Sequence, residues 1–407
     1  MSIQFQQTTL PNGLTILAES SDDARTSAVG FFVKAGTRDE QLPVMGVSHF
    51  LEHMMFKGTA RRTADDVNRE FDEIGADYNA YTSHEKTVYY AHVLPEFLAN
   101  AVDLLGDMLR PALREDDFSM EKNVILEEIS MYEDRPQWRL QDTLLEKYFA
   151  DHALGYRVLG TNDSIKALQA SQMREYFDHR YSPDNIVVSA AGQIDFDKLV
   201  ADVQKIAGHW QPTGAKRDYA SPKTMPGKHV MTDAKLNRHY IGLVCPGPSQ
   251  QDDTRYAASV LSDVIGDSDG SKLYWALVDP GLADEADISH IGMDQTGCYL
   301  AYASCDPDRK EKVRDVLLNV LDDAASGITE QDVQRTKNKL ATQATLHGES
   351  SAGRMRALGS QWLNLGKYTS LADEVEKMMA VTLDDIHQHL ATKPFEKRCV
   401  IELGPGK

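Results

Sequence analysis

The stretch "SHFLEHMMFKGT", Ser48 to Thr59, places two histidines and a glutamate in a run that otherwise has the composition of a buried helix. His49 and His53 are four residues apart, so on a helix they stand on one face, one turn apart. Two neutral imidazoles in that arrangement can hold one zinc ion, and Glu52 lies beside them. The spacing HxxEH is the inverse of the zinc-binding pattern HExxH, in which the glutamate serves as general base. The stretch therefore predicts a metal site with a base next to it.

A catalytic zinc ion needs a third protein ligand and one open position. The helix expected from about Glu115 to Tyr132 supplies two candidates, Glu121 and Glu128. At about 100° per residue they fall about 20° apart, whereas Glu127 falls about 120° away. The two candidates thus lie within the expected apolar stripe, which contains Phe118, Val124, Ile125 and Tyr132. Buried carboxylates are costly unless they are paired, so we expect metal ligation or a hydrogen bond to a ligating histidine.

The elements around these residues alternate between strand and helix patterns. The segments "NGLTILAES", "TSAVGFFVKAG" and "VYYAHVL" read as strands, and "TADDVNREFDEIG" reads as a helix. Thr63 is its expected N-cap, Asp66 completes a capping box and Gly75 follows its end. Hairpin-like strand neighbours separated by long helices favour an α+β fold over a doubly wound parallel sheet.

The length and internal pattern of the chain indicate two domains. At 407 residues the chain exceeds the size that one hydrophobic core supports. Residues 211–229 are rich in Pro, Gly and Lys and are expected to link a domain at 1–210 to a domain at 230–407. A weak repeat pairs Asp117 with Asp332 and Lys122 with Lys337, an offset of 215 residues. Glu128 then falls on Gln343, so a duplicated chain would retain the chemistry in its first half only.

Composition limits the classes of partner and the compartment. The net charge of −19 argues against nucleic acid and favours basic ligands, or it serves solubility alone. The four cysteines show no CxxC spacing and read as core thiols in a reducing compartment. No signal-peptide pattern and no apolar run long enough to span a membrane is visible. The cytoplasm is the expected location, and a removed leader stays open.

Five stretches carry a resemblance to a known family. They are "HFLEHMMFKGT", "GADYNAYTSHEKTVYY", "EKNVILEEISMYEDRP", "LGYRVLGTNDSIKAL" and "YSPDNIVVSAAGQID". In this order they resemble the insulinase/pitrilysin family of zinc peptidases, in particular short bacterial members similar to the catalytic (beta) subunit of the mitochondrial processing peptidase. The resemblance covers essentially the whole chain and is strongest in residues 10–195.

The resemblance implies a role for each candidate residue. His49, His53 and Glu128 would ligate one zinc ion per chain, Glu52 would be the general base, and Glu121 would support a ligand or the base. The cleft-edge strand that receives an extended peptide would consist of Asn79, Ala80, Tyr81 and Thr82. The implied fold has two similar roll domains per chain, each a mainly antiparallel sheet packed with helices, and two chains enclose a clam-shell chamber.

One departure from the family pattern affects the expected assembly. Active members carry an arginine and a tyrosine, seven residues apart, that bind substrate beside the zinc, but here Leu277 and Asp284 stand at those places. We expect a zinc endopeptidase that is the catalytic subunit of a heterodimer whose partner supplies the missing pair. The alternatives are a homodimer of reduced or altered activity, a non-catalytic assembly subunit and a metal-binding module without catalysis; the intact HxxEH and Glu52 argue against the last two.

Overall fold

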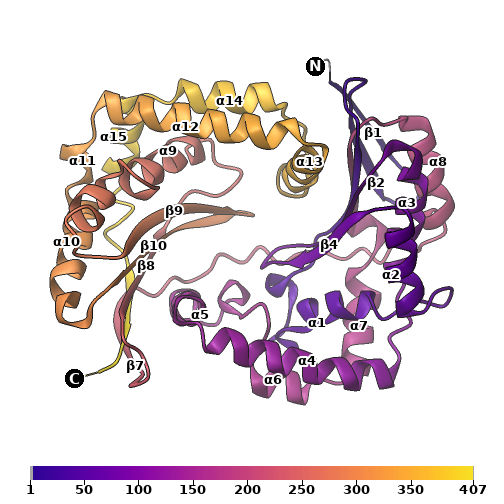
Figure 1. Cartoon of the computed structure of the whole chain (residues 1–407), viewed down its shortest axis with the longest axis horizontal. Coiled ribbons are helices and arrows are strands. Elements are labelled where there is room, and N and C mark those ends of the chain that lie inside the picture. Colours follow the sequence, from indigo (N-terminus) through magenta and orange to yellow (C-terminus); the bar gives the residue numbers. More distant parts are fainter. Residues whose placement is uncertain (1–2, 407) are drawn as a thin grey trace. The chain divides into compact units, whose positions relative to one another are not determined.

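The computed structural model describes residues 3–406, which group into two compact units. Unit 1 contains the chain up to Ser130, Tyr156–Asp218 and Leu346–Tyr368. Unit 2 contains Met131–Gly155, Tyr219–Thr345 and the chain from Thr369 onward. Each unit is a sheet covered by helices (Figure 1).

Unit 1 is built on a six-stranded sheet with the order β1-β2-β6-β3-β5-β4. β2 and β6 are parallel, and the other neighbouring pairs are antiparallel. The strands are β1 (Gln4–Thr9), β2 (Thr15–Ser20), β3 (Ser27–Val33), β4 (Asp77–Thr82), β5 (Thr87–Val93) and β6 (Ile186–Gly192). β3 lies inside the sheet and is buried along its whole length, and every residue after Ser27 is apolar. β4 lies at an edge and pairs with β5 alone.

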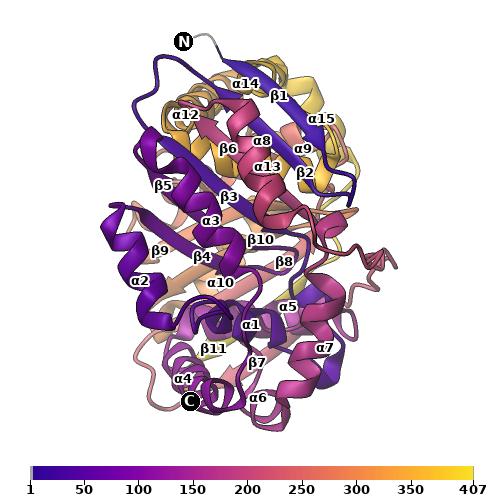
Figure 2. The same cartoon turned by 90° about the vertical axis from the view of Figure 1, so that its right-hand side faces the viewer.

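Helices cover both faces of this sheet. The helices are α1 (Val47–Met55), α2 (Ala64–Glu73), α3 (Leu98–Met108), α4 (Glu115–Glu133), α6 (Asn162–Ala167), α7 (Ala170–Arg180), α8 (Phe196–Ala207) and α13 (Ser351–Leu365). α3 and α8 pack on the face that is turned to the viewer in Figure 2, and α13 packs on the opposite face, as Figure 1 shows. α2 begins at the capping box of Thr63 and Asp66, as the sequence predicts.

Unit 2 repeats this plan with a five-stranded sheet in the order β7-β11-β8-β10-β9. Its strands are β7 (Gly227–Thr232), β8 (His239–Pro246), β9 (Glu285–Met293), β10 (Thr296–Cys305) and β11 (Cys399–Gly404). Its helices are α5 (Pro136–Phe149), α9 (Arg255–Gly266), α10 (Lys310–Asp322), α11 (Ala324–Gly327), α12 (Glu330–Glu349), α14 (Leu371–Ala380) and α15 (Leu383–Ala391). β7 and β11 are parallel, and the other neighbouring pairs are antiparallel. The strands β2-β6-β3-β5-β4 of unit 1 have the same order of parallel and antiparallel pairs. The predicted α+β fold with two similar, mainly antiparallel domains is confirmed.

The boundaries of the units differ from a division at a single linker. α5 comes from the first half of the chain but packs on β8 and β11 of unit 2. α13 comes from the second half but packs on β2, β3 and β6 of unit 1. Each half of the chain therefore gives one helix to the other half's sheet, because both helices bury an apolar face there.

Three further expectations concern helix α4, the cysteines and membrane-spanning segments. Val124 was expected in the apolar stripe of α4, but its side chain is 45% exposed, so the buried stripe is narrower and is formed by Phe118, Ile125 and Ile129. All four cysteines are free and buried. Within residues 3–406, no helix combines the length and apolarity that crossing a membrane requires.

Candidate active site

Helix α1 carries the HxxEH stretch and is fixed at its N-terminus by Glu40. The Glu40 carboxylate accepts the backbone N–H of Gly46 at 2.7 Å and of Ser48 at 2.8 Å. These are donors that a helix leaves unpaired in its first turn. Gly46 has φ +93, and a Cβ there would lie 2.8 Å from the Cα of Gly160. The cap and this close approach fix where α1 begins.

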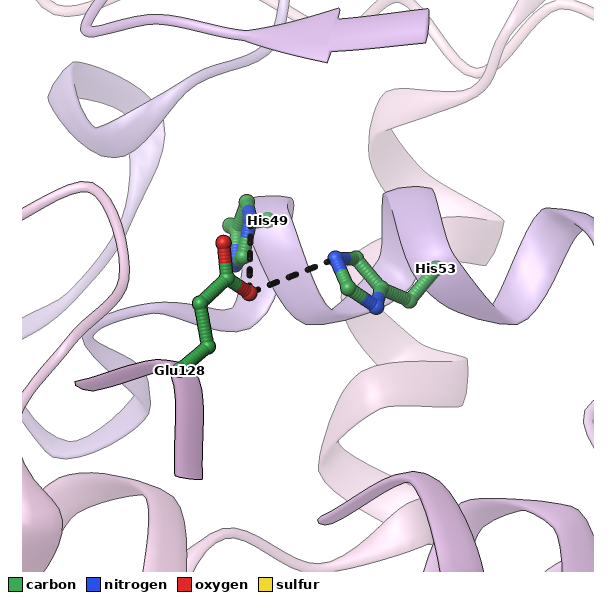
Figure 3. A group of neighbouring side chains, drawn as sticks. All are labelled: His49, His53 and Glu128. Atoms are coloured by element: carbon green, nitrogen blue, oxygen red, sulfur yellow. Dashed lines mark ion pairs between the residues drawn. The ribbon is translucent and has the colours of Figure 1, made fainter. Parts of the chain in front are cut away.

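The two histidines and Glu128 of α4 meet at one point. Glu128 Oε2 lies 3.7 Å from His49 Nε2 and 3.6 Å from His53 Nε2. Figure 3 shows the carboxylate facing both imidazoles. Donor atoms of these three residues lie within 4.8 Å of one another, and no other such group of His, Cys, Asp and Glu occurs within residues 3–406.

The donor set fits a metal ion because the atom that faces both imidazoles lacks an ordinary partner. Glu128 Oε2 is buried and has no hydrogen-bond partner among the described residues. Burial raises the pKa of Glu128 and lowers the pKa of His49 to about 3, the latter with a further contribution from His53. Buried polar atoms without partners are rare, and a neutral imidazole is the form that ligates metal. Two nitrogens and one oxygen are a common donor set for zinc.

Glu121 and Lys57 hold the second histidine. His53 Nδ1 donates to Glu121 Oε1 at 2.9 Å, which leaves Nε2 directed at Glu128. The other oxygen of Glu121 pairs with Lys57 Nζ at 2.5 Å. Burial alone would lower the pKa of His53, but the Glu121 hydrogen bond and the charges of Glu128 and Glu121 outweigh it and raise the pKa. A carboxylate on the far nitrogen fixes the orientation of a ligating histidine.

Glu52 lies beside this group with one oxygen engaged. Thr82 Oγ1 donates to Glu52 Oε2 at 2.5 Å. Burial raises the pKa of Glu52, while the Thr82 hydrogen bond and the charge of His53 oppose that rise. A carboxyl whose pKa is raised holds a proton more readily than an ordinary glutamate, which suits a group that must accept a proton and return it.

The predicted substrate strand is β4, one of the two edge strands of unit 1. Its outer backbone groups are not paired with another strand, which is what an added peptide strand requires. One of them, the Ala80 N–H, donates to Asn79 Oδ1 at 2.8 Å. Tyr81 and Thr82 complete the predicted set, and Thr82 also contacts Glu52.

The places of the missing arginine and tyrosine lie in unit 2. Leu277 is fully buried in the core of that unit, and Asp284 pairs with Arg238 at 3.1 Å. The buried leucine offers no polar atom, and the carboxylate of Asp284 already has a cationic partner.

Two contributors were missed at the level of sequence. Lys57 lies in the same stretch as the histidines, four residues after His53, and this spacing could have identified it. The side-chain contact of Thr82 with Glu52 had no such signal, because it joins a strand end to a helix across 30 residues.

Two family models and a group of curated proteins match the chain. Residues 15–162 match the model of the insulinase family, peptidase family M16, and residues 167–340 match the peptidase M16 inactive domain. A protein of Mycobacterium leprae named an uncharacterized zinc protease is 36% identical over 403 residues, which covers 96% of this chain and 89% of the relative.

Solved structures share the fold. A protease from Helicobacter pylori superposes with a TM-score of 0.92 at 21% identity, covering 100% of both chains. A chain of complex III2 from Candida albicans superposes with a TM-score of 0.86 at 20% identity, covering 98% of this chain and 96% of that one. Identities this low carry the fold alone, whereas the family follows from the match to the mycobacterial relative along almost its whole length. The chain belongs to the insulinase family of peptidases, family M16.

Proposed function

We propose that the chain is a zinc-dependent endopeptidase that cleaves extended or unfolded peptides. The observation that carries the proposal is the buried Glu128 Oε2, which has no hydrogen-bond partner among the described residues and faces His49 Nε2 and His53 Nε2. Family membership supports the reaction class, because close relatives are named zinc proteases. His49, His53 and Glu128 would hold one zinc ion.

Each residue of the site has a separate task in this proposal. Zinc bound there would polarise the scissile carbonyl and activate water for attack. Glu52 takes a proton from the attacking water and delivers it to the amine nitrogen as the C–N bond breaks. Glu121 holds the orientation of His53, and β4, through Asn79 to Thr82, pairs with the peptide as an additional strand.

The assembly proposed is a heterodimer. The complete HxxEH set beside a buried Leu277 and an ion-paired Asp284 fits a division of tasks, in which a homologous partner supplies the arginine and tyrosine. A homodimer of altered activity is the alternative. We place the chain in the cytoplasm, where its buried thiols would stay reduced.

The test compares the wild-type chain with Glu52→Gln, each alone and with a homologous chain carrying the Arg/Tyr pattern. Zinc content is measured by elemental analysis, and turnover is measured with a mixture of quenched-fluorescence peptides of varied sequence. We expect both proteins to retain one zinc ion, and only the wild type to cleave peptides. Retained turnover in Glu52→Gln would remove Glu52 from the mechanism. Full activity of the wild-type chain alone would overturn the heterodimer.

A further inference from the structure

Thr82 is the last residue of β4, and its hydroxyl donates a hydrogen bond to Glu52, the proposed general base. Oγ1 donates to Glu52 Oε2 at 2.5 Å and lies 3.3 Å from Thr87 Oγ1. We propose that Thr82 is a positioning residue whose hydroxyl fixes the Glu52 carboxylate, so that the strand receiving the substrate also orients the base. This inference rests on the proposed peptidase function.

The period of the strand places this hydroxyl on the side of the sheet where α1 lies. Side chains alternate along a strand, so Tyr78, Ala80 and Thr82 share one face. Tyr78 and Ala80 pack against the core that includes α1, whereas Tyr81 packs against the core on the opposite face with α13. A shift of β4 by one residue would direct the hydroxyl away from Glu52.

The turn that follows Thr82 is anchored at several points. Ser83 N–H donates to Lys86 O at 2.9 Å, and Arg38 N–H donates to His84 O at 2.8 Å. The Arg38 guanidinium also pairs with Glu85 at 2.6 Å, with the arginine side chain almost fully buried. Unlike a mobile loop tip, this turn therefore holds the end of β4 in place.

Gly36 belongs to the same anchor. A Cβ at Gly36 would lie 2.7 Å from the carbonyl of His84, so only glycine lets the chain approach the turn this closely. The position of the Thr82 hydroxyl is thus set by buried neighbours and not by its own edge strand alone.

The chemical consequence follows from the inventory of hydrogen-bonding groups. A threonine hydroxyl has one proton to donate, and an ionised carboxylate only accepts. With Oε2 engaged by Thr82, Oε1 is the oxygen left to take the proton from water. Fixing one oxygen also restricts rotation of the carboxylate, and loss of orientation in a catalytic group reduces rate without changing how the substrate binds.

The test uses Thr82→Val, which keeps the β-branched shape, the strand and its backbone groups but removes the hydroxyl. Thr82→Ser restores a hydroxyl, and Thr9→Val in β1 is the matched control on the opposite edge of the sheet. We expect Thr82→Val to lower kcat by about 10- to 100-fold, with Thr82→Ser recovering most of the loss. KM and zinc content should stay at wild-type values. In the background of Glu52→Gln, Thr82→Val should cause no further loss.

Three outcomes would overturn the inference. They are an unchanged kcat in Thr82→Val, a raised KM with kcat preserved, and a second loss of equal size on top of Glu52→Gln. If Thr82→Val does not fold, Thr82→Ser and Thr82→Ala decide, since only alanine should lose kcat. A wild-type protein without zinc-dependent cleavage would instead refute the proposed function itself, and zinc content measured in parallel separates the two failures.

Discussion

The helix pair in unit 1 that carries His49, His53 and Glu128 has a counterpart in unit 2, offset by 215 residues along the sequence. In unit 1, Lys57 pairs with Glu121 of α4 at 2.5 Å. In unit 2, Lys272, which is 215 residues later, pairs with Asp332 of α12 at 2.8 Å. Both units thus use a lysine at the same place in the repeat to attach the facing helix, but the acids differ in position, because Asp332 stands at the place of Asp117, one turn before that of Glu121.

A second lysine pair makes the correspondence closer. Lys122 Nζ donates to Lys166 O at 3.2 Å and Leu168 O at 2.7 Å, where α6 ends. Lys337 Nζ donates to Met379 O at 2.8 Å and Val381 O at 2.7 Å, where α14 ends. The duplicated units keep this helix-terminus contact nearly unchanged.

The difference lies in the donor atoms. At the same offset His49, His53 and Glu128 fall on Val264, Ser268 and Gln343, and Glu52 falls on Asp267. Val264 is fully buried in the core, and Asp267 is paired with Lys339 at 2.5 Å. The lysine contacts that attach the helices are therefore common to both units. The imidazole and carboxylate groups of His49, His53 and Glu128 occur in unit 1 alone, because Val264, Ser268 and Gln343 stand at their places in unit 2.

The largest effect should come from making α4 resemble α12. Glu128→Gln removes the anionic donor and should weaken zinc binding by more than about 100-fold, beyond the loss caused by changing an outer partner of a ligand. Competition with a chromogenic chelator measures the affinity. Its matched control, Gln343→Glu, should leave zinc affinity and stoichiometry unchanged. A second zinc ion in that control would contradict the comparison.

The two lysines at the facing helices should differ in their effect on zinc. Lys57→Met frees Glu121, which no longer holds His53 firmly, so zinc affinity should fall by about tenfold. Lys272→Met removes an ion pair of the same kind in unit 2 and should leave zinc affinity at the wild-type value. The same chelator competition compares the two, and equal losses would show that Lys57 acts through general stability.

Stability should depend on pH in opposite senses at two acids. Burial, with a smaller contribution from Asp39, raises the pKa of Glu40 from 4.5 to about 7, against the hydrogen bonds from Ser48 and Gly46. The folded state therefore binds more protons between these values, and the free energy of unfolding of unit 1 should fall by up to about 3 kcal/mol as pH rises through that window. In unit 2, burial tends to raise the pKa of Asp332, but hydrogen bonds from Lys272 and Thr329 outweigh it and lower the pKa from 3.8 to about 2. Ionised Asp332 therefore stabilises unit 2, and this stabilisation is lost as the pH falls from 3.8 to about 2.

Amide hydrogen exchange in α1 and α12 at a series of pH values separates the two units. Glu40→Gln should remove the decline in protection of α1 between pH 4.5 and about 7. A decline of unchanged size in Glu40→Gln would assign it to other groups.

The smallest effect should be equal in the two units. Lys122→Met and Lys337→Met each remove two hydrogen bonds from a charged group to the carbonyls at the end of a helix. Each should lower the free energy of unfolding of its own unit by about 1–2 kcal/mol without changing zinc affinity. Urea denaturation followed by amide hydrogen exchange measures the free energy of unfolding of each unit. A loss of stability in only one of the two variants would show that the two contacts are not equivalent.

Much of the candidate site and of the fold was predictable, because both depend on how residues repeat along single helices and strands. The spacing of His49 and His53 and the 3.6-residue period of α4 place the histidines and Glu121 and Glu128 on facing sides, and the structure brings them together. Their roles as ligands and supports remain predictions. The α+β fold followed from the strand and helix patterns, which are also local.

The unpredicted features depend on contacts between distant parts of the chain. The exchange of α5 and α13 between the two halves of the chain has no sequence signal, because an amphipathic helix does not specify which apolar sheet it will cover. Val124 is apolar yet exposed, because the helical period shows which residues of α4 share a face but not how much of that face neighbouring elements will bury. The hydrogen bond from Thr82 to Glu52 could not be predicted, because it depends on where β4 lies along α1 and the sequence does not specify this.

The central claim is tested most directly by anomalous diffraction at the zinc edge from crystals of the full-length protein purified without added chelator. The account predicts one anomalous peak per chain, within bonding distance of His49, His53 and Glu128, and no peak among Val264, Ser268 and Gln343. A zinc-loaded protein whose peak lies elsewhere, or a protein that binds no zinc at these residues, would contradict it.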